Sequence, residues 1–214
     1  QLEAGSFATS YIPTTTATVT RAADVASISG SNFGAFRTNL LEYSEEFDQA
    51  AWTGSTNVTP NTSISPAGTT TADTLAISTP GTWLLQSVAI ASNATIAFSV
   101  YAKELATAFA LVRIANFTNT SYRDVWFDLS SGSVGTVDGT GGDVVSAVGA
   151  IEQSQNGFYR ISVIAVTSGI TDAVARIATV ASDGSFTRTG SIYIWGAQLE
   201  EGSTATDYIK SDVN

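Results

Sequence analysis

The stretch TIAFSVYAKELATAFALVRIANFTNTSYRDVWFDL, residues 95–129, contains three short segments in which apolar and polar side chains alternate. In the last of them, Val125 and Phe127 alternate with Asp124 and Trp126. A period of two is typical of a β-strand that buries one face, because neighbouring side chains point to opposite sides. Asn, Thr and Ser separate the segments and favour turns. The stretch therefore predicts an antiparallel sheet with short connections.

The same pattern continues along the rest of the chain. It predicts ten strands, at 69–77, 83–90, 95–102, 108–116, 122–129, 133–137, 145–152, 158–167, 173–181 and 190–199. Only Tyr43 to Ala51 has the character of a short helix, with Ser44 as its cap ahead of two acidic residues. Short strands at this spacing predict an all-β fold, an antiparallel β-sandwich.

Composition excludes several classes of protein. The chain has 214 residues, of which 43% are hydrophobic and 13% charged, so it is too apolar for intrinsic disorder and corresponds to one large domain or one domain with an appendage. It contains no His and no Cys, which excludes imidazole- and thiol-based catalytic triads and the usual imidazole zinc site.

Charge and hydropathy bear on possible partners. Nine cations against nineteen acids give a net charge of −10, and the cations are scattered singly along the sequence. Nucleic acid is therefore not expected as a partner, because a phosphate backbone requires clustered Lys and Arg. No apolar stretch approaches the ~20 residues of a membrane span, and residues 1–13, QLEAGSFATSYIP, lack the basic start and apolar core of a signal peptide, so no membrane partner is expected. The first residue is not Met, and we expect the sequence to begin inside a longer gene product.

An internal repeat suggests the domain organisation. Residues 1–14, QLEAGSFATSYIPT, align without gaps with residues 198–211, QLEEGSTATDYIKS, and nine of the fourteen positions are identical. We interpret residues 1–38 as the end of a preceding module followed by a Thr- and Ala-rich linker, forming an extended N-terminal arm. Residues 39–214 are then the complete module. In this arrangement Leu199 is expected at the edge of the sandwich, and the arm is expected to contribute to assembly.

Six motifs follow one another over residues 39–209. They are NLLEYSEEFDQAAWT (39–53), GTTTADTL (68–75), AFSVYAKE (97–104), FDLSSGSVGTV (127–137), IEQSQNGFYRISVIAV (151–166) and IYIWGAQLEEGSTATDYI (192–209). In this order they resemble the carbohydrate-binding-module-like domains of bacteriophage tail and head-fibre proteins. The resemblance implies a jelly-roll β-sandwich of the galactose-binding-like kind. It also implies an extracellular position on the phage particle surface or tail, homotrimeric assembly, contact with other virion proteins, and host recognition.

Sugar binding requires an aromatic plate for the apolar face of a pyranose, flanked by planar polar groups. The strand alternation predicts an outward face that could supply them. Its candidate residues are Trp126, Tyr122, Asp124, Arg113, Arg160, Arg176 and Tyr101, with Trp83 and Gln86 as a second candidate pair. The same residue types are enriched at subunit interfaces, so this face predicts a glycan site and a protein interface equally. Trp52 and Trp195 are expected to fill the core or to seal its ends.

No residue pattern indicates catalysis. Glycoside hydrolysis requires two carboxylates about 5–10 Å apart, but nineteen acids would give such a pair in any fold. The glycine-rich run 132–142 lacks the Gly-Lys-Ser/Thr of a phosphate loop and is typical of hairpin turns. Asp128, Asp138 and Asp143 have oxygens that could bind a structural calcium ion, and no other cofactor is expected.

Two functional hypotheses remain open. In the first, the chain is a non-catalytic phage fibre module that binds host cell-surface polysaccharide. In the second, it is a purely structural virion protein, serving as decoration, spacer or trimerisation domain without glycan binding.

Overall fold

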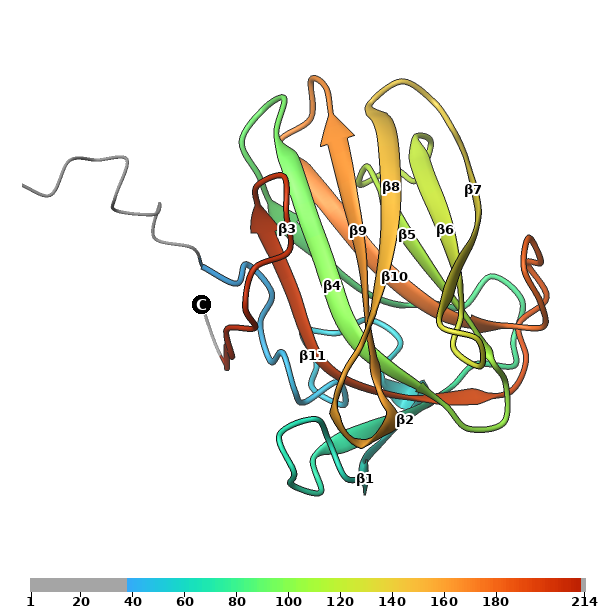
Figure 1. The fold of residues 1–214 in the computed structure, drawn as a ribbon. Helices are drawn as coiled ribbons and strands as arrows, with labels where there is room; N and C mark the ends of the chain where they lie inside the picture. Colours follow the sequence, from blue (N-terminus) through green and yellow to red (C-terminus); the bar gives the residue numbers. More distant parts are fainter. Residues whose placement is uncertain (1–37, 213–214) are drawn as a thin grey trace, which may run out of the picture. The chain divides into compact units, whose positions relative to one another are not determined.

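A computed structural model describes residues 38–212, in which eleven strands form two antiparallel sheets packed face to face (Figure 1). The helices of this part of the chain are two three-residue 3-10 turns, η1 (Ser55–Asn57) and η2 (Gln155–Gly157). No helix in residues 38–212 is long and apolar enough to cross a membrane. The arm predicted for residues 1–38 lies outside the described residues except for Thr38, so the domain division stays a prediction.

The strand order in the two sheets is that of a jelly roll. One sheet has six strands, in the order β1 (Val58–Ser63), β2 (Ala72–Ala76), β11 (Ser191–Glu201), β4 (Thr95–Glu104), β9 (Tyr159–Thr167) and β8 (Val144–Gln153). The other has five, in the order β3 (Leu84–Ala89), β10 (Asp172–Val180), β5 (Phe109–Ala115), β6 (Tyr122–Asp128) and β7 (Ser133–Thr140).

Strands that follow each other in sequence mostly change sheet, so that β2-β11-β4-β9 faces β3-β10-β5-β6. Eight strands arranged in this way form a double-sheet jelly roll. Strand β1 extends one edge of the six-stranded sheet, and β8 extends its other edge by pairing with β9. Strand β7 extends the five-stranded sheet by pairing with β6 (Figure 1). The predicted all-β sandwich is confirmed.

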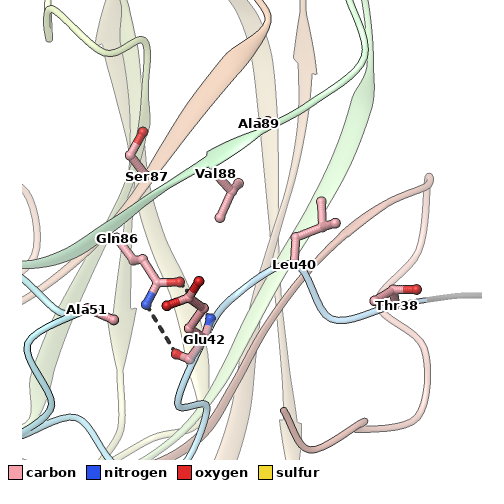
Figure 2. Close-up of a pocket in the computed structure, with 8 residues that line it drawn as sticks. All are labelled: Thr38, Leu40, Glu42, Ala51, Gln86, Ser87, Val88 and Ala89. Atoms are coloured by element: carbon pink, nitrogen blue, oxygen red, sulfur yellow. Dashed lines mark hydrogen bonds between the residues drawn. The ribbon is translucent and has the colours of Figure 1, made fainter. Parts of the chain in front are cut away.

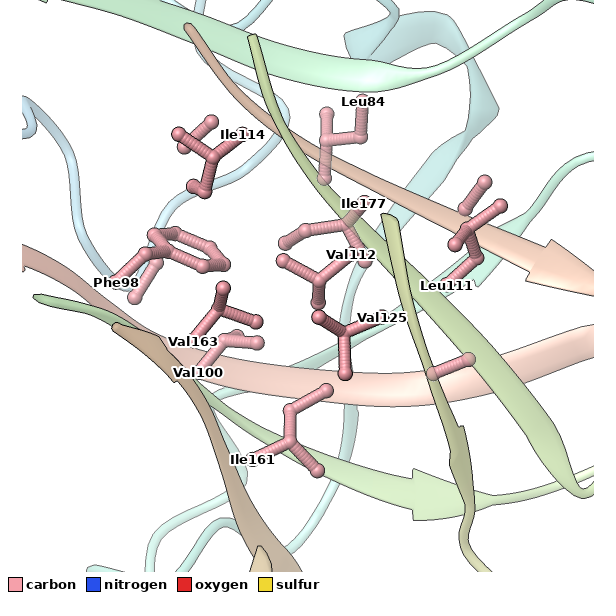
Figure 3. Close-up of a cluster of buried hydrophobic side chains, with 14 of the residues drawn as sticks. Leu84, Phe98, Val100, Leu111, Val112, Ile114, Val125, Ile161, Val163 and Ile177 are labelled. Carbon is pink, nitrogen blue, oxygen red and sulfur yellow. The ribbon is translucent and has the colours of Figure 1, made fainter. Parts of the chain in front are cut away.

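The alternating apolar residues meet between the sheets, as the sequence pattern predicts. Phe98, Val100, Ile161 and Val163 point inward from the six-stranded sheet, and residues of β5, β6 and β10 point inward from the five-stranded sheet (Figure 3). All of these side chains are fully buried. Burying a large apolar side chain contributes roughly 1.5–3 kcal/mol, so this layer supplies the main driving force for folding.

Two local predictions are wrong. Residues 43–51 form turns instead of a helix: their backbone bonds run from Glu46 to Tyr43 and from Gln49 to Glu46, three residues apart, and not four as in an α-helix. Tyr43 also has a φ of 49°, outside the helical region. The pattern of alternation misses strand β1, because its sequence VTPNTS is polar and contains a proline, as an edge strand tolerates.

The C-terminal copy of the repeat is part of the sandwich, and its Leu199 lies in the core. Leu199 pairs with Phe98 of β4, its carbonyl accepts the N–H of Leu40 at 2.8 Å, and its side chain is fully buried, so the expected edge position is wrong. The buried Glu200 carboxylate accepts hydrogen bonds from the Gln198 side chain (2.8 Å) and from Thr206 (2.7 Å for both N–H and hydroxyl). The Gln198 side-chain oxygen accepts the N–H of Ile209 at 2.6 Å. Gln198, Leu199, Thr206 and Ile209 belong to the positions that are identical in the two copies.

Candidate functional site

The outer face of the five-stranded sheet holds a cluster of arginines and aromatic rings. We call it the arginine–aromatic cluster, and its members are Trp83, Arg113, Tyr122, Asp124, Arg176 and Arg188. Strand register places Arg176 opposite Arg113, and Arg113 opposite Asp124, across β10, β5 and β6. Arg188 comes from the connection between β10 and β11. The cluster thus combines five of the predicted site residues with one that the sequence did not indicate.

Arg113 and Asp124 form a buried, two-pronged ion pair at the centre of the cluster. Arg113 Nε donates to Asp124 Oδ1 at 2.7 Å and Nη2 donates to Oδ2 at 2.6 Å. The guanidinium carbon lies 3.6 Å from the ring centroid of Tyr122 and 4.8 Å from that of Trp83. Burial raises the pKa of the Asp124 carboxyl, and the bonds from Arg113 lower it in part. Asp124 is fully buried and is occupied by Arg113, so it is not free to bind a ligand.

Trp126 does not form the exposed plate that the alternation predicts. Its side chain is on the predicted outer side of β6 but is only 1% exposed. The indole N–H donates to the carbonyl of Ser185 at 2.9 Å, and Phe186 packs edge-on against the ring at 5.2 Å between centroids. The connection between β10 and β11 therefore covers Trp126. Outward orientation on a strand and exposure to solvent are different properties in this sheet.

Trp83, which immediately precedes β3, and Gln86 of β3 contact different parts of the protein and do not form a joint site. Trp83 packs beneath the guanidinium of Arg188, whose carbon is 4.1 Å from its ring centroid. The Gln86 side chain turns the other way, accepts the N–H of Glu42 at 2.7 Å and donates to its carbonyl at 3.1 Å (Figure 2). Gln86 lines a pocket of about 560 Å³ beside residues 38–42. Its amide is already paired, so it serves to hold that segment against β3.

Arg160 and Tyr101 lie on the outer face of the other sheet. Arg160 is paired with Tyr101 in the β4–β9 register, its guanidinium carbon is 5.6 Å from the tyrosine ring centroid, and its Nη2 donates to Ser99 Oγ at 2.9 Å. Tyr101 in turn packs against Trp195 and Tyr208. Trp195 is buried there and Trp52 lies in the main core, as expected for both. The single predicted face is therefore two faces, on opposite sheets.

Arg160 lines a pocket of about 310 Å³ between β8, β9 and residues 203–205, which we call the Arg160 pocket. Glu152 and Ser162 add polar groups to its wall, and Ala150, Ile164 and Ala205 add apolar surface. The Nε of Arg160 is buried and has no hydrogen-bond partner in the part of the chain that the structure describes. A buried donor without a partner is unfavourable.

The three aspartates that could bind calcium each accept hydrogen bonds from other groups of the protein. Asp128 accepts hydrogen bonds from Ser130 and Ser131, and the Ser130 hydroxyl is the main cause of its lowered pKa. Asp138 accepts the N–H of Gly139, and Asp143 accepts the side chain of Asn116. Within residues 38–212, no group of three His, Cys, Asp or Glu side chains is placed to hold a metal ion. The structural calcium stays a prediction.

The chain matches no known protein family, and no curated protein matches it in sequence. Among solved structures it is similar to the enzymatically active domain of tailspike protein 4 of bacteriophage CBA120, with a TM-score of 0.42 and 14% sequence identity. The similarity covers 75% of this chain and 21% of that chain. The present chain thus spans about a fifth of the length of the tailspike structure.

Proposed function

We propose that this chain is a non-catalytic module of a phage virion appendage, and that its Arg160 pocket binds one sugar residue of a host cell-surface polysaccharide. The observation that carries the proposal is a pocket of about 310 Å³ whose wall combines the side chains of Arg160, Glu152 and Ser162 with apolar surface. Ligand sites commonly have volumes of ~300–1,000 Å³ and combine apolar walls with a few polar groups. The Arg160 pocket has this composition, with polar and apolar side chains from β8, β9 and the loop at 203–205.

The chemistry of the pocket suits reversible binding. A sugar hydroxyl can accept a hydrogen bond from Arg160 and donate one to the Glu152 carboxylate. Glu152 is the only acid among the residues that line the pocket, whereas the usual glycosidase mechanisms use two carboxyl groups. The resemblance of residues 39–209 to phage fibre domains supports a virion appendage and the other virion proteins as partners.

The first test is the variant Arg160→Ala. We expect it to lose binding to the polysaccharide that the unaltered chain selects from an array of bacterial surface glycans, with affinity lowered about tenfold or more, since a hydrogen bond to a charged group contributes ~1.5–3 kcal/mol. The measurement is glycan-array binding followed by calorimetric titration of the selected glycan.

Arg123→Ala is the matched control, because Arg123 is also partly exposed but donates its hydrogen bonds to backbone carbonyls of β6, β7 and β8. It should retain glycan binding. If the unaltered chain binds no glycan, or if Arg160→Ala binds as well as Arg123→Ala, the Arg160 pocket is not the binding site.

A structural role is the second candidate function, and one feature of the sandwich favours it. Four valines on the neighbouring edge strands β7 and β8, Val134, Val137, Val145 and Val148, are between 37% and 67% exposed. Edge strands of monomeric proteins are usually protected by Lys, Pro or short length, but β8 has ten residues and neither Lys nor Pro. This edge is suited to pairing with another chain in the trimer that the resemblance implies.

In that case Val148→Lys, at the most exposed of the four valines, should weaken self-association. A charge at an apolar contact loses the burial of the valine and must be desolvated, so we expect the dissociation constant of the oligomer to rise at least about tenfold. Sedimentation velocity over a range of concentrations measures this. Ile64→Lys, at a 54% exposed position following the opposite edge strand β1, is the control. Equal association of both variants would exclude the β8 edge as the contact.

A further inference from the structure

The arginine–aromatic cluster holds more positive charge than its one buried carboxylate can balance. Of the nine cations of the chain, Arg21 and Arg37 precede residue 38, which leaves seven in the described part. Three of these seven lie around Asp124: Arg113 is paired with it, and Arg176 and Arg188 each lie close enough to be influenced by both Arg113 and Asp124. The chain as a whole carries a net charge of −10, so this local excess is opposite in sign to the rest of the protein.

Asp124 forms an ion pair with only one of the three arginines, Arg113. Both of its oxygens accept hydrogen bonds from Arg113, and within residues 38–212 neither Arg176 nor Arg188 forms an ion pair. Arg176 stands directly opposite Arg113 in the sheet, where like charges repel. Burial, followed by the neighbouring Arg113 charge, lowers the pKa of both Arg176 and Arg188, that of Arg188 to about 10.

Unpaired donors accompany this charge. The Nε of Arg176 and the Nη1 of Arg188 are buried and have no hydrogen-bond partner within residues 38–212, and Arg188 is only 6% exposed. Arg188 does donate a hydrogen bond from its Nε to the Thr82 carbonyl at 3.3 Å. Planar guanidinium groups pair best with planar oxyanions, which they bind through two parallel hydrogen bonds.

The surroundings of the arginines also suit a sugar ring. Phe186 is 48% exposed, and its ring centroid lies 6.0 Å from the guanidinium carbon of Arg113. Tyr122 and Arg176 are partly exposed on the same outer face. A pyranose beside the guanidinium groups would therefore have aromatic surface to pack against.

We propose that the arginine–aromatic cluster binds the carboxylate of an acidic sugar residue, a uronic acid, through Arg176 and Arg188, with the sugar ring against Phe186. This is a second site, on the outer face of the five-stranded sheet, and it does not depend on the Arg160 pocket. The carboxylate supplies the counter-charge that Asp124 cannot give to all three arginines. The ligand approaches from the side of Arg176, the more exposed of the two guanidinium groups.

The test is a nuclear magnetic resonance titration of the 15N-labelled full chain, which follows the Nε–Hε signals of its arginines. The probes are oligogalacturonate, the matching neutral oligogalactose, and inorganic phosphate, all at constant ionic strength. We expect saturable shifts of the Arg176 and Arg188 signals with oligogalacturonate, and unchanged signals from Arg123 and Arg160. Arg176→Gln should weaken oligogalacturonate binding about tenfold, as loss of a charge-assisted hydrogen bond implies.

A control variant distinguishes binding at the arginine–aromatic cluster from a general effect of the protein's net charge. Lys103→Gln removes one positive charge on the other sheet and should bind oligogalacturonate as the unaltered chain does.

The melting temperature of Arg176→Gln should stay the same or rise, because repulsion from Arg113 is relieved. Unchanged Arg176 and Arg188 signals with oligogalacturonate, equal shifts with oligogalactose or with phosphate, or equal weakening by Lys103→Gln would each overturn the assignment to an acidic sugar. None of these outcomes bears on Arg160→Ala, so the two sites are tested separately.

Discussion

Trp126→Ala should lower the free energy of unfolding by about 3–5 kcal/mol, the usual loss for truncation of a buried tryptophan. The indole is 1% exposed, packs against Phe186 and donates to the Ser185 carbonyl. The substitution leaves a cavity between β6 and the connection at 181–190 and removes the bond that anchors that connection. Chemical denaturation with urea, with the slope checked for two-state behaviour, measures the loss.

Phe186→Ala is the natural comparison for this variant. Phe186 is the other ring of the pair but is 48% exposed, so its removal should cost far less than removal of Trp126. Trp126→Phe should fall between the two, because it keeps an aromatic ring but loses the indole N–H. An unfolding free energy of Trp126→Ala within about 0.5 kcal/mol of the unaltered chain, the range of ordinary surface substitutions, would contradict the buried placement.

Asp124→Asn should be comparably severe, at about 3–5 kcal/mol, because it removes one partner of a buried ion pair. The asparagine has nearly the same volume, so the loss reports charge and hydrogen bonding rather than packing. Without the carboxylate, Arg113 stays buried between Tyr122 and Trp83, and three neighbouring guanidinium groups have no counter-charge in the cluster. Thermal and urea unfolding at low ionic strength should show the effect most clearly, since salt screens the remaining repulsion.

Two further variants make this result interpretable. Asp138→Asn removes an exposed carboxylate opposite Asp124 in the β6–β7 register and should change stability little. The double variant Arg113→Met with Asp124→Leu removes both partners, and it should be more stable than Asp124→Asn alone because no unpaired charge from this pair is left buried. If Asp124→Asn is no less stable than Asp138→Asn, the ion pair is not a significant part of the sandwich.

The strands were the most predictable part of the chain, and the reason is physical. A strand in a two-layer sandwich buries every second side chain, so its core residues carry a period of two that requires no knowledge of their partners. Ten strands and the inward positions of Phe98, Val112, Val125 and Ile161 follow from that rule. The turns at 43–51 do not follow from it, and their hydrogen bonds to residues 211 and 212, at the far end of the sequence, leave no local pattern.

The sequence by itself determined the fold class, the inward faces of the strands, and the outward side of Arg113, Asp124, Trp126 and Arg176. Only the tertiary structure decided which outward residues reach solvent. The connection at 181–190 covers Trp126 on the five-stranded sheet, and alternation along one strand carries no information about a loop that covers it. Tertiary structure also decided the grouping of charge: cations that are scattered singly in the sequence meet at Asp124, because the β10–β5–β6 register and the return of Arg188 join positions far apart in the chain.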